Sequence, residues 1–224
     1  MKSHWNLSVC IPPIFRSVLL TPLVLLAGTG CSIFGIESVE QAQYRVELQD
    51  GKFEIREYAS MVVVETRVDA EFRSAGNAAF QRLFAYISGD HTGSKKIAMT
   101  APVVAEQGDS REKIAMTSPV TAATAGTGWV YRFVLPQSYS IETAPRPLHP
   151  EVSLLEVPAR RVAAIRFSGR FTETALEQQT TALNEWLADA GIAATSAPRW
   201  AGYNAPWALP PFRRNEVLVD IAVR

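Results

Sequence analysis

Cysteine is scarce in this chain, and neither sign of charge dominates. Cys10 and Cys31 are the only cysteines among 224 residues, and 22 Lys and Arg are balanced by 22 Asp and Glu. A formal charge of zero provides no broad basic surface, so nucleic acid is not an expected partner. A chain of this length is sufficient for one domain with a substantial core.

The apolar run near the start is too short for a permanent membrane span. It extends from Val18 to Gly30 and is interrupted by Pro22. As a helix it would cover only about 20 Å, whereas the hydrocarbon core is ~30 Å thick. The segment before it contains Lys2 and Arg16 but no acidic residue. This pattern is typical of a secretory signal peptide.

Small residues from Gly28 to Gly30 precede Cys31 and resemble a bacterial lipobox, although Gly28 holds the place where leucine is usual. Cleavage at an ordinary signal-peptide site nearby is the alternative. Removal of residues 1–30 would leave Cys31 as the only thiol, which excludes an intramolecular disulfide and suits lipid attachment. We therefore expect a signal peptide (1–30), a tether (31–43) and a folded domain (44–224).

A lipid on Cys31 would anchor the domain to a bacterial cell envelope, facing the periplasm. Ser32 follows the cysteine where an aspartate would be the inner-membrane sorting residue. By resemblance to lipoprotein sorting signals, this favours the outer membrane. The membrane, through this anchor, is thus an expected partner.

Motifs of the common enzyme classes are missing from the sequence. There is no G-x-S-x-G, no glycine-rich phosphate loop and no C-x-x-C-H for covalent haem. Beyond the signal only His91 and His149 remain, both in turn-like segments where we expect surface positions. Two isolated histidines do not make a zinc site. The sequence therefore favours a binding protein without a metal centre over an enzyme.

Two stretches, residues 57–84 and 156–183, follow the same pattern at an offset of 99 residues. Each contains strand-like runs, then a phenylalanine (Phe72 or Phe171), then an amphipathic helix. This is the pattern of an internal duplication.

The helices of the two halves are predicted from apolar spacing. The first runs from about 74 to 88, with Phe80, Leu83, Phe84 and Ile87 as its apolar stripe, and ends at Gly89. The second begins with a capping pair, Thr174 and Glu177, and ends at Gly191.

Two further stretches, 129–135 and 216–223, alternate with the period of strands that bury one face. Strands and helices in two similar halves predict an α+β fold. In it, duplicated β-α-β halves form a distorted antiparallel β-barrel flanked by two helices.

The motif KIAMT-x-PV occurs twice, from Lys96 and again from Lys113. The residue before each proline is restricted to extended conformations, so each copy is strand-like. A charged segment with Gly108 and Asp109 separates them, which predicts an antiparallel hairpin of the two copies. In the simplest interpretation their Ile and Met side chains fill the core. In a functional interpretation Met99 and Met116 line an apolar ligand site.

The motif KIAMTAPV, preceded by an amphipathic helix and followed by AGYNAPWALPPFRRNEVLV, resembles the SOUL haem-binding protein family. FEIREY, PRPL and RNEV also match that family's pattern. The resemblance covers about residues 44–223. It implies a duplicated α+β fold related to bacterial effector-binding domains, and non-covalent binding of haem or another tetrapyrrole in an apolar cleft.

Some SOUL proteins have a histidine, proposed as the haem ligand, where this chain has Glu57. A carboxylate is a poor substitute for imidazole on haem iron. In other members, the porphyrin is held mainly by apolar contacts along the first helix and the loop before the last strand.

By this resemblance the expected haem contacts lie in the first helix, in the two motif copies and in the loop before the last strand. They are Arg82, Leu83, Tyr86, Met99, Met116, Tyr203, Trp207, Phe212, Arg213 and Arg214. Aromatic faces can sandwich a flat macrocycle, and guanidinium groups can bind its propionates.

Two alternatives remain for the function. One is an envelope adaptor or structural lipoprotein with a vestigial pocket. The other is an effector-binding or hydrolase relative in which Glu57 acts in the cleft.

Overall fold

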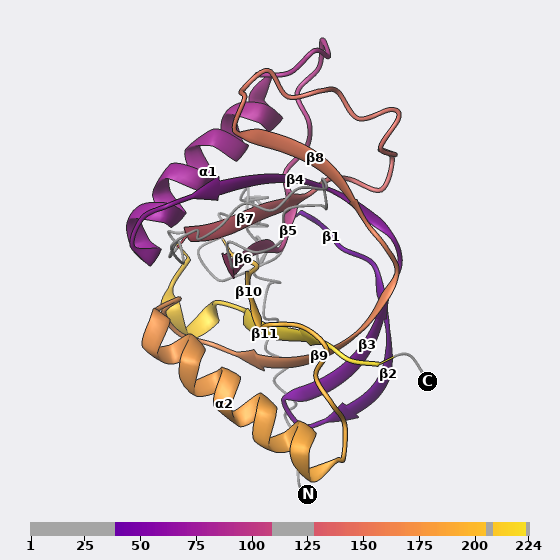
Figure 1. Cartoon of the computed structure of the whole chain (residues 1–224), viewed down its shortest axis with the longest axis vertical. Coiled ribbons are helices and arrows are strands. Elements are labelled where there is room, and N and C mark those ends of the chain that lie inside the picture. Colours follow the sequence, from indigo (N-terminus) through magenta and orange to yellow (C-terminus); the bar gives the residue numbers. More distant parts are fainter. Residues whose placement is uncertain (1–38, 109–127, 205–207, 223–224) are drawn as a thin grey trace, which may run out of the picture. The chain divides into compact units, whose positions relative to one another are not determined.

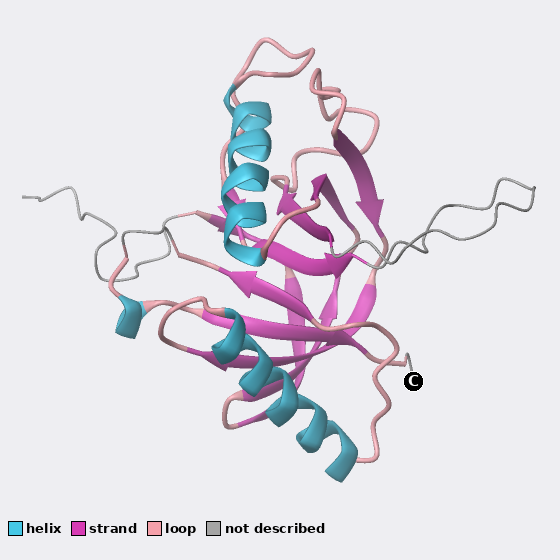
Figure 2. Cartoon of the chain, turned by 60° about the vertical axis from the view of Figure 1, so that its left-hand side comes forward, coloured by secondary structure: helices cyan, strands magenta, loops and turns pink. Residues whose placement is uncertain are grey.

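The computed structural model describes residues 39–108, 128–204 and 208–222. A large curled antiparallel sheet forms a half-barrel, and Figure 2 shows both long helices on the same side of it, so the expected α+β fold is confirmed. In the described part of the chain, no helix is both long and apolar enough to cross a membrane. The elements in chain order (Figure 1) are β1 (Glu40–Gln41), β2 (Tyr44–Asp50), β3 (Phe53–Tyr58), β4 (Met61–Val68), α1 (Phe72–Ser88), β5 (Thr100–Ala101), β6 (Val103–Gly108), β7 (Gly128–Val134), β8 (Val152–Val157), β9 (Arg160–Phe167), α2 (Glu173–Asp189), β10 (Arg199–Gly202), the 3-10 helix η2 (Pro210–Phe212) and β11 (Asn215–Asp220).

The internal repeat of the sequence is a structural repeat. β3 and β8 begin and end 99 residues apart, and so do β4 and β9. The order of the sheet is β2-β3-β9-β11-β10-β6-β7-β4-β8. The first strand of each half pairs with the second strand of the other half, β3 with β9 and β8 with β4. Because the halves exchange strands, they form one sheet and one domain.

Both helices lie where the apolar spacing predicted them. α1 ends at Ser88, and Gly89 follows with φ 131°, a conformation that a side chain would strain. The N-cap of α2 is Thr172, whose side chain accepts a hydrogen bond from the Ala175 N–H. The N-cap therefore lies two residues before Thr174, and the predicted capping pair of Thr174 and Glu177 is wrong.

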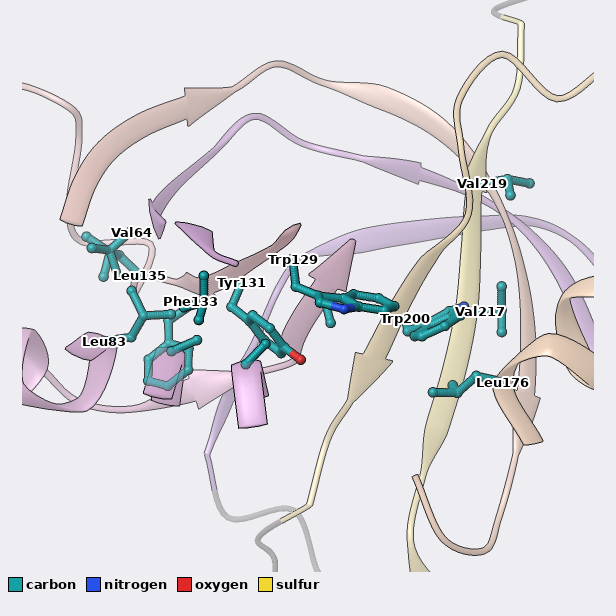
Figure 3. Packing of buried hydrophobic residues seen from close by; sticks show 14 of the residues in the cluster. Val64, Leu83, Trp129, Tyr131, Phe133, Leu135, Leu176, Trp200, Val217 and Val219 are labelled. Carbon is teal, nitrogen blue, oxygen red and sulfur yellow. The ribbon is translucent and has the colours of Figure 1, made fainter. Parts of the chain in front are cut away.

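The main core lies between the helices and the outer face of the sheet. α1 covers β4 and β7, and α2 covers β9 and β11. Figure 3 shows a continuous layer that runs from Leu83 of α1, past Trp129 and Trp200, to Leu176 of α2. Trp129, Tyr131, Phe133 and Leu135 all belong to this layer, which confirms the predicted alternation of that strand.

The inner face of the sheet carries a smaller apolar cluster that includes Tyr58, Val162, Ala164 and Leu218. The short strand β1 lies inside the curl and pairs in parallel with β5 (Figure 1). The folded domain therefore starts before the expected boundary at residue 44, and the end of the expected tether is part of it.

The first KIAMT-x-PV copy passes through β5 into β6. β6 already pairs with β10 on one side and β7 on the other, so from Val103 onward the first copy has no free edge. Val103, the last residue of the first copy, therefore does not pair with the second copy, and over the rest of the motif the hairpin stays a prediction. The second copy, including Met116, lies outside the described residues. Ile97 is buried and Met99 is half-buried against the core, as expected for core side chains.

Candidate functional site

A buried polar cluster centred on Glu216 lies on the inner face of the sheet. Arg56 donates two hydrogen bonds to the Glu216 carboxylate, from Nη1 at 2.6 Å and from Nη2 at 2.9 Å. Arg214 donates from Nε at 2.9 Å, and the Tyr203 hydroxyl donates at 2.7 Å. Two arginines and a tyrosine thus satisfy a carboxylate with no exposed surface.

The electrostatics of this cluster fix the charge of Glu216. Burial by itself would raise the pKa of Glu216, but the hydrogen bond and charge of Arg56 and the charge of Arg214 lower it below its ordinary value. Burial, followed by the Glu216 charge, raises the pKa of Tyr203 well above its ordinary value. Glu216 is therefore ionised at neutral pH while Tyr203 keeps its proton. A carboxylate held in this way links strands and has a weak tendency to accept a proton.

Tyr203 and Arg214, two of the expected haem contacts, belong to this cluster. The Arg214 guanidinium lies 3.9 Å from the centroid of the Tyr203 ring and donates to the Tyr44 hydroxyl at 3.0 Å. Both residues are buried. Their aromatic and cationic groups are engaged within the protein.

The three expected contacts on α1 have partners inside the protein as well. Leu83 and Tyr86 are buried beneath the helix, and the Tyr86 hydroxyl donates to the Pro145 carbonyl at 2.8 Å. Arg82 forms an ion pair with Glu151 at 3.0 Å. These side chains support the fold and do not line either of the two cavities described below.

On α1 the rings of Phe80 and Phe84 stack with centroids 5.7 Å apart, and Phe80 also packs edge-on against Phe133 of the core. Phe84 is 47% exposed, so it is not part of the buried stripe in which the helical spacing placed it. The buried stripe is centred on Leu83 and Ile87. The helical spacing therefore predicted burial correctly for Leu83 and Ile87 and in part for Phe80, but not for Phe84.

The predicted loop before the last strand borders a hollow of about 420 Å³. Phe212 is 51% exposed there, and Arg213 donates from Nε to the Ala208 carbonyl at 2.8 Å. Sequence reasoning missed Arg166, whose side chain has no hydrogen bond or ion pair among the described residues. Trp207, also expected here, lies outside them. The hollow is lined by Arg166, Phe167, Ser168, Pro211, Phe212, Arg213 and Arg214.

The two histidines lie away from this hollow. His91, which we expected at the surface, is only 4% exposed, so that prediction is wrong. Its Nδ1 accepts a hydrogen bond from the Gly93 N–H at 3.0 Å, and its ring packs edge-on against Tyr86. His149 accepts from the Glu151 N–H in a turn. Across the part of the chain that the structure describes, no three His, Cys, Asp or Glu residues are grouped to hold a metal.

The model of a known protein family, described as SOUL heme-binding protein, matches residues 39–220. The chain belongs to the SOUL haem-binding protein family. The resemblance drawn from the sequence motifs is thus confirmed, and binding of haem or a tetrapyrrole is supported at the level of the family. A comparison with curated protein sequences found no matching relative.

Several solved structures share the fold of this SOUL domain. The EcmrR C-terminal domain is 13% identical with a TM-score of 0.56, over 81% of this chain and 99% of that one. EcmrR in a DNA complex is 12% identical with a TM-score of 0.55, over 77% of this chain and 57% of that one. A hydrolase from Listeria innocua is 12% identical with a TM-score of 0.51, over 79% and 94% of the two chains. Identities this low show a common fold alone.

Glu57 of this SOUL domain, at the position of the histidine in some members, is exposed on β3. Its carboxylate pairs with Arg45 at 2.7 Å, and it lines neither of the two cavities. The structure therefore offers no support for iron ligation or for acid-base catalysis through this position.

Proposed function

We propose that this SOUL domain binds haem or a related tetrapyrrole non-covalently, at the hollow beside Phe212. The observation that carries the proposal is that an exposed aromatic ring and the two arginines Arg166 and Arg213 line one hollow. An aromatic ring packs well on a flat macrocycle. Guanidinium groups form two-point, charge-assisted hydrogen bonds with carboxylates such as propionates.

The lining residues fit a macrocycle that is held without an iron bond. They include no His, Cys, Met or Tyr. Burial of ~300 Å² of apolar macrocycle at about 25 cal/mol per Å² contributes about 7–8 kcal/mol before association costs, and charge-assisted hydrogen bonds to the ligand carboxylates add to it. Arg214 has a different role here, because its side chain donates to Glu216 in the buried polar cluster.

The test is a titration of the full-length chain, in nonionic detergent, with haem and with metal-free protoporphyrin. We expect saturable changes in the porphyrin absorbance at micromolar ligand, with similar affinities for both ligands. Detergent without protein serves as the control. Absence of any change in the Soret band at micromolar haem would favour the adaptor with a vestigial pocket. Much tighter binding of haem that depends on His91 or His149 would show that iron ligation dominates.

We also propose that the domain is anchored to the bacterial envelope through a lipid on Cys31, and that the outer membrane is its site. The support is the sequence pattern of the first 31 residues, together with Ser32. Only a short segment separates Cys31 from β1, which begins at Glu40. An anchor at Cys31 would therefore keep the domain close to the membrane surface.

A further inference from the structure

A second cavity, of about 390 Å³, shares no residue with the hollow beside Phe212. Its walls come from the N-terminal segment with β1, the turn between β3 and β4 with the start of β4, β5, the end of β7 with the loop after it, and β8. The lining residues are Glu40, Gln41, Ala42, Gln43, Ala59, Ser60, Met61, Val62, Thr100, Val134, Leu135, Pro136, Gln137, Tyr139, Ser140, Ile141, Glu142 and Glu156.

The floor of this cavity is apolar and held in place by backbone hydrogen bonds. Val62, Val134 and Leu135 are buried, and the Leu135 N–H donates to the Val62 carbonyl at 2.9 Å. The N-terminal wall is fixed in the same way, because the Ala42 N–H donates to the Ala101 carbonyl at 3.1 Å. The cavity is thus built from paired backbone and not from a loop alone.

The charged residues that line the cavity are all acidic, and behind its wall the Arg214 guanidinium donates to the Gln41 side chain at 3.1 Å. Glu40, Glu142 and Glu156 line it, and none of the lining residues is Lys, Arg or His. Glu40 Oε1 accepts from the Gln137 N–H at 2.8 Å, and Glu142 Oε2 accepts from the Ser140 hydroxyl at 2.6 Å. These bonds orient two carboxylates at the cavity. Within the described residues, the side chain of Glu156 has no hydrogen bond or ion pair.

These features fit an organic cation better than a metal ion. In the described ranges, no three acidic, histidine or cysteine side chains converge on a common point as metal ligands would. Tyr139 adds a half-buried aromatic ring, which attracts an alkylated ammonium group. An apolar floor stabilises the organic part of a ligand, which a strongly hydrated metal ion does not have.

We propose that this cavity binds a small amphipathic organic cation, a substituted amine or quaternary ammonium compound with an apolar group. The apolar group contacts Val62, Val134 and Leu135, while the cationic head lies at the acidic rim of the cavity beside Tyr139. The cavity volume falls in the range that accommodates small-molecule ligands. The site shares no lining residue with the hollow proposed for the tetrapyrrole, although Arg214 of that hollow donates to Gln41 of this cavity.

The test is isothermal titration of the full-length chain, in nonionic detergent, with benzyltrimethylammonium and with its uncharged isostere neopentylbenzene. We expect the cation to bind and the isostere to bind at least about tenfold more weakly, because only the charge differs. Glu142→Gln and Glu156→Gln should each weaken binding of the cation by about two- to fivefold, as expected for partly exposed charge pairs. The double variant should combine both losses.

Glu185→Gln, on the exposed side of α2, makes the same change in net charge away from the cavity and should leave the affinity unchanged. Phe212→Ala should also leave it unchanged, which separates this site from the tetrapyrrole hollow. Equal affinities for the cation and the isostere would overturn the proposal. So would full affinity in the Glu142→Gln/Glu156→Gln double variant, or no heat of binding up to about 10 mM cation.

Discussion

Arg56 and Glu216 form a two-point ion pair, although β9 lies between the strands β3 and β11 that carry them. On the same face of β9, Val162 and Ala164 have short side chains, so the longer side chains of Arg56 and Glu216 can meet above them. The pair connects two strands that have no backbone hydrogen bonds with each other. It is therefore a tertiary link within the sheet, and it engages Arg214, which the sequence had suggested as a ligand contact.

Glu216→Ala should reduce the free energy of unfolding by about 3–5 kcal/mol, because it leaves two buried guanidinium groups without their carboxylate. Urea unfolding of the full-length chain measures this loss. Glu57→Ala is the matched control, because it removes an exposed ion pair with Arg45 and should cost less than about 1 kcal/mol. Similar losses in both variants would show that the cluster does not stabilise the fold.

The stability of the protein should fall in acid partly through Glu216. The folded state lowers the pKa of Glu216. Its contribution to the free energy of unfolding is therefore complete above the unfolded-state pKa of about 4.3 and is lost as the pH falls through the folded-state pKa. We expect the wild-type chain to lose stability below about pH 4, and Glu216→Gln to lose less over the same interval. Unfolding in urea at a series of pH values gives both slopes. Parallel slopes would contradict the role of Glu216.

Arg166→Ala and Arg213→Ala should each weaken binding of haem and of metal-free protoporphyrin by roughly tenfold. Both ligands should be affected alike, because their carboxylates do not depend on iron. Arg73→Ala, on the exposed face of α1, is the control and should have no effect. A loss confined to haem would point to the metal and away from the carboxylates.

Phe212→Ala and Leu83→Ala should have opposite consequences. Phe212 is half-exposed in the hollow, so its removal should lower porphyrin affinity with little change in stability. Leu83 is fully buried beneath α1, so its removal should cost about 2–5 kcal/mol in unfolding free energy and leave the affinity of the folded protein unchanged. Porphyrin titration and urea unfolding of each variant test this. Loss of affinity in Leu83→Ala, measured where that variant is folded, would place the ligand at α1.

Cys31→Ser should release the chain from the membrane fraction, and metabolic labelling with a radioactive fatty acid should no longer mark it. Cys10→Ser lies within the expected signal peptide and should leave both properties unchanged. Identical fractionation of the Cys31→Ser variant and the parent, with no label on either, would show that no lipid anchor exists.

The local elements of the fold followed from the sequence because they depend on periodicity within a few residues. The 3.6-residue spacing around Leu83 predicted α1, and the alternation around Tyr131 predicted β7, both with nearly the observed bounds. The offset of 99 residues predicted the duplication, and the structure confirms it, because β3 and β8, and likewise β4 and β9, begin and end 99 residues apart.

Only the tertiary structure decided how the two halves combine and which side chains remain accessible. Strand exchange depends on pairing between residues about a hundred positions apart, and no local pattern encodes it. Arg213 and Arg214 are neighbours of the same type, yet only Arg214 is buried against Glu216, which lies two residues further along the chain in β11. Arg166 reaches the hollow through the register of β9 with β11, although it is distant in sequence from the loop that supplies Phe212. The sequence determined the elements, the repeat and the family, whereas long-range strand pairing determined the composition of each cavity.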